Sequence, residues 1–598
     1  MNLINAALGR IVVDTLITNV RVANVLTGEI YPADIAIHQG KIVALEPPNL
    51  QPPRQASRVI DGKGMIATPG LVDSHLHIES TVITPAHFAE AVLPLGTTTV
   101  LEDPHEIANV LGAAGIRAFL AASENIRLKV EFLVSSSVPS ALGLETAGGA
   151  IEPDDVRALL KHPRVRGLAE VMDGTGLMDG DRRLFDILAA AGGGYGYMAG
   201  AQSYGVIEGH NPMLRGRALC AFVAAGVDSD HTQASAADLV EKARQGVTIM
   251  LQERYITREV IAALESLPFD IGTCIITDDV APEYLLDHGH LDHVMRQCIR
   301  LGMSPMRALR ACTLNPARRM RLWDRGLIKP GCAADIVLTE SLDDFCAKLV
   351  LVDGVIVAEN GRMMPNAIAP AAIAQANEAL GAFAKTVHLA PQQASDFAIL
   401  LPNEVENSAT VEIRVIDCGP STQTRLGYAS VPLRDGVLQL SDDMAFICVV
   451  DRHEQHGGRA FGVVRGLGLR RGAFASSVAH DSHNLCVIGH SPAEMALAAN
   501  AVIASDGGIA VVDGAQVLAH MALPIAGLLS GQPIAETAAE SRAVYAAFNQ
   551  LGLVHSHWLM RISTFTLPVS SGLRITDLGL VDANAREIVP LVVSSQII

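Results

Sequence analysis

Short apolar runs alternate with helix-like segments between residues 65 and 325, and these runs repeatedly stop at histidine or acidic residues. The first run, residues 65–74, ends in His75-Leu76-His77. Seven more runs follow at residues 97–101, 130–134, 165–169, 204–209, 225–230, 247–251 and 271–277. Eight strand–helix units in about 250 residues predict a (β/α)8 TIM-like barrel, with functional residues at the carboxyl ends of the strands. A doubly wound open sheet is the competing fold, but only a closed ring lets the ends of distant strands converge.

Strand-like alternation also occurs on both sides of this region. Residues 11–62 read as short strands with turns, and a similar pattern returns at residues 328–338 and 348–358. We expect these flanks, residues 1–64 and 326–365, to form one small β-sandwich domain around a barrel of residues 65–325. Residues 366–598 are expected to form an α+β domain, with a helical connector near 366–390, a helix near 492–505 and a strand at 507–514.

Charge and cysteine content narrow the function classes. The chain has 45 basic and 63 acidic residues, a formal net charge of −18, which argues against nucleic acid or an anionic membrane as partner. The nine cysteines are scattered without a CxxC pair, so reduced thiols in a cytoplasmic protein are the simplest interpretation. We find neither a signal-peptide pattern nor an apolar stretch of about 18 residues that predicts a membrane span.

The ends of the predicted strands carry metal-ligand residue types. His75 and His77 are two residues apart, so an extended backbone points both imidazoles to one face, and imidazole is a common ligand for Zn, Mn and Fe. Taken alone, the pair is equally compatible with hydrogen-bonded histidines. The full candidate set is His75, His77, Glu170, His210, His231 and Asp278. Six ligands are too many for one catalytic zinc and suit two metals bridged by a carboxylate and a water.

These residues and several further motifs resemble a known family. The segment 69–77 (PGLVDSHLH), the strand-end histidines, Asp278 and the return strand at 330–337 are similar to the amidohydrolase superfamily. The chain also resembles the bacterial adenine deaminase family over nearly its full length, through motifs at residues 76–80 (LHIES), 103–110 (DPHEIANV), 167–172 (GLAEVM), 277–279 (TDD), 480–484 (HDSHN) and 523–530 (LPIAGLLS).

The resemblance implies metal-dependent hydrolysis of adenine to hypoxanthine and ammonia, through attack of a metal-bridging hydroxide on purine C6. It implies a binuclear divalent centre, with Mn or Fe as first candidates and Zn as a further one. His75 and His77 would bind one metal together with Asp278, and His210 and His231 would hold the other. A small-molecule purine substrate and a homodimer are expected on the same basis.

The resemblance also suggests roles in catalysis. Glu170 stands where many relatives have a carboxylated lysine, so it is the expected bridging carboxylate. Asp278 and Glu170 are the candidates to relay a proton. His105 follows the next strand and is a candidate to polarise the substrate or to bind an extra metal, with a purely structural role as the alternative.

Four loops depart from the family pattern. Residues 231–232 are His-Thr instead of His-Glu, and residues 252–255 are Gln-Glu-Arg-Tyr instead of Arg-Glu-Gly-Ser. Residues 173–176 lack an aromatic-Pro-Gly turn, and residues 208–213 read Glu-Gly-His-Asn-Pro-Met where Asp-Gly-His-x-Pro-Gly is expected. The ligands survive these changes. Because the altered residues are expected to line the substrate pocket, they bear on adenine as substrate more than on deamination.

Three other functions stay open at this point. One is deamination of another aminopurine, and a second is cyclic-amide hydrolysis within the same superfamily, which commonly uses a lysine where this chain has Glu170. The third is a non-catalytic metal or nucleobase binder, which the intact ligand set disfavours.

Two further clusters have simpler interpretations. Residues 480–484 are expected to form an internally hydrogen-bonded loop over the barrel mouth rather than a second metal site, and residues 451–456 a solvated turn rather than part of a neighbouring subunit's pocket.

Overall fold

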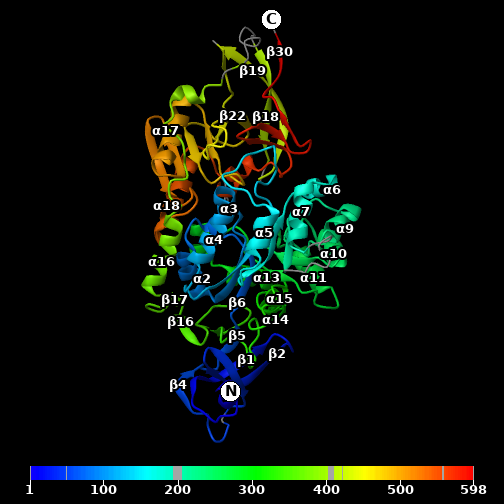
Figure 1. The fold of residues 1–598 in the computed structure, drawn as a ribbon, viewed down its shortest axis with the longest axis vertical. Helices are drawn as coiled ribbons and strands as arrows, with labels where there is room; N and C mark the ends of the chain where they lie inside the picture. The colour runs from blue at the N-terminus through cyan, green and yellow to red at the C-terminus, as the bar shows by residue number, and fades with distance from the viewer. Residues whose placement is uncertain are drawn as a thin grey trace.

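Three structural parts follow one another along the long axis of the molecule (Figure 1). The computed structural model describes residues 2–48, 50–192, 205–399, 401, 410–419, 422–434, 436–554 and 558–596. Tyr204, which opens the predicted run 204–209, lies outside these residues. The sheet built from the two flanks lies at the lower end in Figure 1, the barrel in the middle and the C-terminal domain above it.

Eight strands form the barrel, in two hydrogen-bonded groups of parallel strands. The first group is β6 (Leu71–Leu76), β7 (Thr97–Glu102), β8 (Lys129–Val134), β9 (Val165–Val171) and β10 (Val206–Gly209), and the second is β11 (Ser229–Asp230), β12 (Thr248–Leu251) and β13 (Cys274–Ile275). The amide of Asp228 donates to Ile207 O over 2.9 Å and joins the groups. A parallel bridge between Leu76 and Asp278 closes the ring. The predicted barrel is therefore confirmed.

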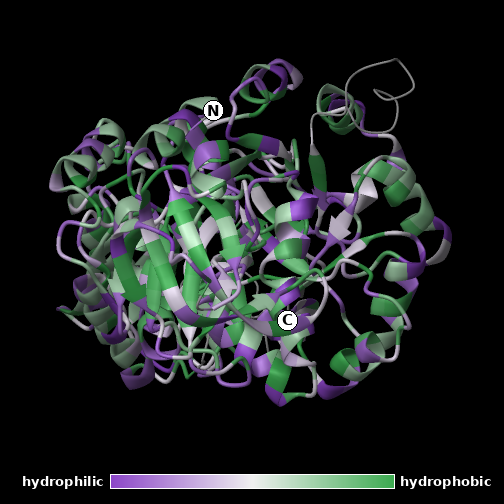
Figure 2. Cartoon of the chain, turned by 90° about the horizontal axis from the view of Figure 1, so that it is seen from below, coloured by the Kyte–Doolittle hydropathy of each residue, from purple (hydrophilic) through white to green (hydrophobic). Residues whose placement is uncertain are grey.

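Helices follow the strands and surround the barrel. They are α2 (Pro85–Val92), α3 (His105–Leu111), α4 (Ala113–Ala122), α5 (Pro153–Leu159), α6 (Gly174–Asp179), α7 (Arg182–Ala190), α9 (Gly216–Ala224), α10 (Ala236–Arg244), α11 (Arg258–Glu265), α12 (Pro282–His288), α13 (Leu291–Arg300), α14 (Pro305–Ala311) and α15 (Leu314–Arg319). Several begin at side-chain caps: Ser235 accepts from the amide of Asp238, and Thr257 from that of Val260. Seen from below, hydrophobic residues dominate the inner strands, and polar residues colour the loops (Figure 2).

The two flanks of the barrel build one nine-stranded sheet. Its strands are β1 (Val13–Asn24), β2 (Glu29–His38), β3 (Lys41–Glu46), β4 (Ala56–Asp61), β5 (Ile66–Pro69), β14 (Ile336–Thr339), β15 (Leu349–Val352), β16 (Val355–Glu359) and β17 (Arg362–Met363), and helix α1 (Asn2–Ala7) precedes them. The two flanks meet where β14 pairs antiparallel with β5, Ile336 opposite Pro69. Because β5 leads directly into β6, this sheet anchors the start of the first barrel strand.

The C-terminal domain has a ten-stranded sheet and a smaller three-stranded one. The larger sheet contains β18 (Thr410–Cys418), β19 (Thr424–Arg434), β20 (Val437–Leu438), β21 (Met444–Val450), β22 (Arg459–Arg465), β23 (Ala473–Ser476), β24 (Leu485–Gly489), β25 (Gly508–Asp513), β26 (Gln516–Ala522) and β30 (Val592–Gln596). The smaller contains β27 (Leu573–Thr576), β28 (Gly579–Asp582) and β29 (Glu587–Val589). The helices are α16 (Pro370–Gly381), α17 (Pro492–Ala504), α18 (Ile534–Gln550) and α19 (Trp558–Ser563). Helix α17 and strand β25 match the elements expected at 492–505 and 507–514, and α16 fills only part of the expected connector.

The expectation of a solvated turn at 451–456 is wrong for its first two residues. Asp451 and Arg452 are 1% and 0% exposed. The Arg452 guanidinium donates to the carbonyls of His483 and Ala526, because three loops direct backbone oxygens at one buried point that needs a donor. Only Glu454, Gln455 and His456 of this segment are exposed. None of the helices in the described part of the chain is long and apolar enough to cross a membrane.

Candidate metal centre

The six predicted ligands lie at the carboxyl ends of five barrel strands. His75 is the penultimate residue of β6, His77 follows that strand directly, and Glu170 lies near the end of β9. The remaining three, His210, His231 and Asp278, follow β10, β11 and β13. Five of the six side chains are at most 7% exposed, and the side chain of His210 is 35% exposed. The closed ring thus brings the six ligands to one rim, as their positions at the strand ends predict.

Glu170 forms the centre of one group of ligands. Its Oε1 lies 2.8 Å from Nε2 of His231, 3.0 Å from Nδ1 of His210 and 3.5 Å from Nε2 of His75. The carbonyl of Glu170 accepts a hydrogen bond from Ser137 Oγ over 3.1 Å, which holds this part of β9 against the end of β8. One carboxylate oxygen therefore faces imidazoles from three strands, the position a bridging ligand requires.

Asp278 forms the centre of the other group. Its Oδ1 lies 3.5 Å from Nε2 of both His75 and His77. The backbone of Asp278 has φ of 61°, a left-handed conformation that Asp tolerates better than most residues. Its amide donates to His75 O over 3.3 Å. This turn carries the carboxylate across the closing edge of the barrel to the two histidines.

The ring nitrogens that face away from this cluster are held by other groups. Nδ1 of His75 lies 2.6 Å from Oε2 of the buried Glu208, whose Oε1 accepts from Arg319 over 2.6 Å. Nδ1 of His77 donates to Asp103 O over 2.9 Å. Such partners fix the tautomer and leave Nε2 free to bind a metal. The sequence pattern predicted no such role for Glu208 or Arg319. A glutamate near the end of a buried strand is unusual, and this feature could have suggested a role for Glu208.

The electrostatics of the cluster follow from close imidazole–carboxylate pairs. Burial raises the pKa of Glu170, but the imidazoles of His210 and His231 outweigh it and hold that pKa well below its usual range. Burial lowers the pKa of His77, yet the carboxylate of Asp278 raises it to about 10. The Glu170 carboxylate therefore stays ionised and the His77 imidazole binds its proton strongly, and a divalent cation would displace that proton.

The donor set fits divalent metal ions. Nε2 of His75 is fully buried and has no hydrogen-bond partner among the described residues. It lies 3.5 Å from carboxylate oxygens of Glu170 and Asp278, too far for good hydrogen bonds. Ligands about 2.0–2.2 Å from one ion stand roughly 3.0–3.5 Å apart. The distances of 3.5 Å from His75 Nε2 to the two carboxylate oxygens are therefore typical of atoms that bind the same cation. The triads His75, His77, Asp278 and His75, Glu170, His231 each bring their donor atoms within 4.8 Å of one another.

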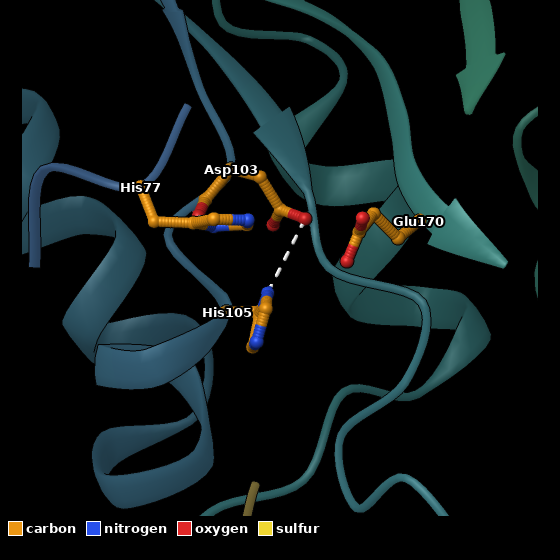
Figure 3. A group of neighbouring side chains, drawn as sticks. All are labelled: His77, Asp103, His105 and Glu170. Carbon is orange, nitrogen blue, oxygen red and sulfur yellow. Dashed lines mark hydrogen bonds and ion pairs between the residues drawn. The ribbon is translucent and has the colours of Figure 1, made fainter. Parts of the chain in front are cut away.

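His105 lies beside this cluster, at the first residue of α3. Donor atoms of His77, Asp103, His105 and Glu170 come within 4.8 Å of one another, and Figure 3 shows the four side chains facing a common space. Nδ1 of His105 lies 3.4 Å from Asp103 Oδ2, and its Nε2 lies 3.2 Å from Glu106 Oε1. Both ring nitrogens therefore have acidic neighbours.

A cavity of about 780 Å³ adjoins the metal ligands. Thr277 and Asp279, the neighbours of Asp278, line it, together with Gln252, Glu253 and Arg254. The last three belong to the loop that departs from the family pattern, so this departure does fall at a cavity wall. Helices of the C-terminal domain contribute Arg542, Tyr545 and Met560 to its lining.

Comparison with known proteins decides the family. The amidohydrolase family model matches residues 66–192 and 195–357, and the adenine deaminase C-terminal domain model matches residues 421–587. A protein named adenine deaminase from Cereibacter sphaeroides is 38% identical over 98% of this chain and 99% of its own length. One named adenine deaminase 2 from Shouchella clausii is 36% identical over 98% of this chain and 100% of its own. The chain belongs to the adenine deaminase family.

Membership of the adenine deaminase family confirms the resemblance drawn from the motifs. It also identifies the chain as an enzyme of the amidohydrolase type, a hydrolase acting on carbon–nitrogen bonds. The match runs from the flank sheet through the barrel into the C-terminal domain, so the three parts described above occur together in these relatives.

Proposed function

We propose that this chain hydrolyses adenine to hypoxanthine and ammonia with a binuclear centre of divalent metal ions. The observation that carries the proposal is the buried histidine–carboxylate cluster at the barrel rim beside a cavity, in a chain whose full-length relatives are named adenine deaminases. Mn and Fe are the proposed ions and Zn is a further candidate, because all three bind imidazole and carboxylate ligands.

Each predicted ligand has a role in this proposal. His75, His77 and Asp278 would hold one ion, His210 and His231 would hold the other, and Glu170 would serve as a ligand of both. The proximity of Glu170 Oε1 to His231 and His210, at 2.8 and 3.0 Å, supports the bridging role. Two close cations would lower the pKa of water, so that hydroxide would be available near neutral pH.

The carboxylates of the site are proposed to transfer the protons of the reaction. In the overall step, the oxygen of water forms a bond to purine C6, the bond from C6 to the exocyclic nitrogen breaks, and that nitrogen leaves as ammonia. Asp278 is proposed to take one proton from the water and deliver it to a ring nitrogen, and then to carry the second proton of the water to the departing amine. Its burial and its ionised state at neutral pH, with a pKa held well below its usual range despite burial by the hydrogen bonds of His75 and His77, support this role. Glu170 is the second candidate.

His105 is retained as a residue of the site. Both of its ring nitrogens face carboxylates, those of Asp103 and Glu106. This arrangement favours metal binding over polarisation of the substrate, one of the two roles expected from its position after β7.

A substrate panel tests the proposed reaction. Full-length protein reconstituted with Mn(II) should release ammonia from adenine faster than from 2,6-diaminopurine, guanine or cytosine. Faster ammonia release from another 6-aminopurine would replace adenine as the proposed substrate but would leave the proposed deamination reaction in place. Ring opening of a hydantoin or dihydropyrimidine without ammonia release from adenine would refute the proposal in favour of cyclic-amide hydrolysis.

Variants of the carboxylates test their roles. Asp278→Asn and Glu170→Gln should each abolish turnover, while far-ultraviolet circular dichroism reports an unchanged fold. Asp353→Asn is the control, because Asp353 pairs with Lys129 beside the flank sheet, far from the rim. A near wild-type rate for Asp278→Asn would remove this residue from the mechanism.

The proposal extends to location and assembly. A cytoplasmic location is supported by the nine cysteines, all of which are free thiols. A homodimer is proposed from the family alone, and light scattering on the eluted protein measures it. The net charge of −18 argues against nucleic acid or an anionic membrane as a partner.

A further inference from the structure

A second group of metal-ligand side chains lies where α3 meets the C-terminal domain. His105 and Glu106 open α3, and His480 and Asp481 belong to the loop between β23 and β24. All four are buried, with exposed fractions of 6%, 2%, 7% and 1%. Two segments that are more than 370 residues apart in the sequence thus place two imidazoles and two carboxylates together.

The four donor atoms alternate between nitrogen and oxygen. Glu106 Oε1 lies 3.2 Å from His105 Nε2 and 2.8 Å from His480 Nδ1. From another side, Asp481 Oδ1 lies 3.7 Å from His105 Nε2 and 3.6 Å from His480 Nδ1. Ligands about 2.0–2.1 Å from a tetrahedral zinc stand about 3.3 Å apart. The four separations scatter around that value.

These atoms lack the hydrogen bonds that buried polar groups normally make. Within the described part of the chain, His105 Nε2, Glu106 Oε1 and both carboxylate oxygens of Asp481 have no hydrogen-bond partner. Buried charged and polar atoms are rarely left in that state, and a bound ion is one of the standard reasons. These four atoms come from three residues of one cluster, which points to a shared ligand.

Further contacts hold the donors in place. Glu106 Oε2 bonds Nε2 of His483, which leaves Oε1 to face His105 and His480. Asp103 holds Nδ1 of His105, the contact drawn as a dashed line in Figure 3, and this turns Nε2 toward Glu106. Oriented donors with secured second atoms are typical of metal sites.

From this geometry we propose a third metal site, formed by His105, Glu106, His480 and Asp481, that binds a divalent first-row ion with Zn(II) as its first candidate. Two carboxylates and two neutral imidazoles carry a charge of −2, which a divalent cation neutralises. Donor atoms of His105, Glu106 and His480 lie within 4.8 Å of one another, and Asp481, which faces both imidazoles, supplies the fourth ligand that a closed zinc site needs. The ion joins the barrel to the C-terminal domain. The sequence-based preference for a loop without metal at 480–484 is replaced by this proposal, although its internal hydrogen bond from Ala479 N to His483 exists.

Counting metal ions tests the site independently of any turnover. Full-length protein is stripped with a chelator, reloaded with Zn(II) or with Mn(II), desalted, and measured by plasma mass spectrometry. Wild type should retain one more ion per chain than Asp481→Asn and Glu106→Gln. A protein carrying both Glu170→Gln and Asp278→Asn should keep one ion that the further change Asp481→Asn removes.

Asp577→Asn is the matched control. Asp577 is a buried carboxylate at the same domain junction, but it is satisfied by Thr146 and His456, so its variant should keep the wild-type metal count. Circular dichroism checks that each variant folds, and His480→Gln replaces Asp481→Asn if the latter does not. Equal counts in wild type and in the folded variants of the four proposed ligands overturn the site.

Discussion

Replacing Glu208 with glutamine should weaken metal binding through His75 while the chain still folds. Glu208 Oε2 lies 2.6 Å from Nδ1 of His75, and its Oε1 lies 2.6 Å from a guanidinium nitrogen of Arg319. Both neighbours are donors. A glutamine offers one oxygen and one amide nitrogen, so its NH2 group must face either the imidazole or the guanidinium. If the NH2 group faces the imidazole, His75 loses the acceptor that orients it. If it faces the guanidinium, Arg319 loses one hydrogen-bond partner.

The size of the effect follows from the role of Glu208 as the partner of a ligand. Removing such a partner typically costs about 10–100-fold in metal affinity, or roughly 1.4–2.7 kcal/mol at about 1.4 kcal/mol for each factor of ten. The upper part of this range is expected, because Glu208 and His75 are both 0% exposed and water cannot replace the lost contact. Arg319 keeps a second carboxylate, Asp228, at 2.8 Å, which limits the loss of stability.

The assay is a competition between the apoprotein and a chelating dye for Mn(II) or Zn(II). Asp228→Asn is the matched control, because Asp228 binds Arg319 but does not contact His75. The control should change metal affinity by less than about threefold, well below the range for a lost ligand partner. If both variants weaken metal binding equally, the effect comes from Arg319 and general stability. If neither does, the orientation argument for His75 is wrong.

Three further substitutions test the packing around the site. Arg452→Met should lower the free energy of unfolding by about 2–4 kcal/mol, because several buried carbonyls lose their donor; urea denaturation measures it, and a loss below roughly 0.5 kcal/mol contradicts it. Gly167→Ala should lower it by at least about 2 kcal/mol, because a Cβ there would lie 2.0 Å from Val206 O and force β9 away from β10; an unchanged Tm would refute the clash. In Glu253, burial raises the pKa but three side-chain hydrogen bonds outweigh it and lower it to about 2 from the usual 4.5. Its stabilising effect is therefore present above about pH 4.5 and fades toward pH 2, so the difference in Tm between Glu253→Gln and wild type should shrink from about pH 7 to about pH 3.5, and a constant difference would contradict the assignment.

The convergence of the proposed ligands was predictable because strand ends of a closed barrel meet at one rim. His210 and His231 needed only the pattern of apolar runs that stop at a polar residue, and the structure has both directly after a strand. The strand boundaries were less predictable. The run at 271–277 forms a strand only at Cys274–Ile275, since Asp278 turns into a left-handed conformation to reach the neighbouring histidines.

Contacts between distant segments were beyond the sequence pattern. Glu106 and His483 are 377 residues apart, and no periodicity relates the start of a barrel helix to a loop of another domain. The charged segment at 451–456 looks solvated for the same reason. Its Arg452 is buried only because carbonyls from separate loops converge on it. The hydropathy of the sequence does not indicate that convergence. A buried arginine with backbone partners can be found only once the tertiary structure is known.

A continuous series of contacts joins the proposed metal ligand His77 to the domain junction. His77 is held through Asp103 O, the Asp103 carboxylate faces His105, and Glu106 beside it meets His480 and His483 of the C-terminal domain. Every side chain in this series is buried. Because packed interiors transmit small shifts, a displacement of one of these side chains shifts its neighbours. A change in the loop at 480–484 therefore reaches His77 through contacts of about one hydrogen-bond length each. The C-terminal domain thus contacts the residues that hold His77 in place, as well as lining the cavity at the barrel rim.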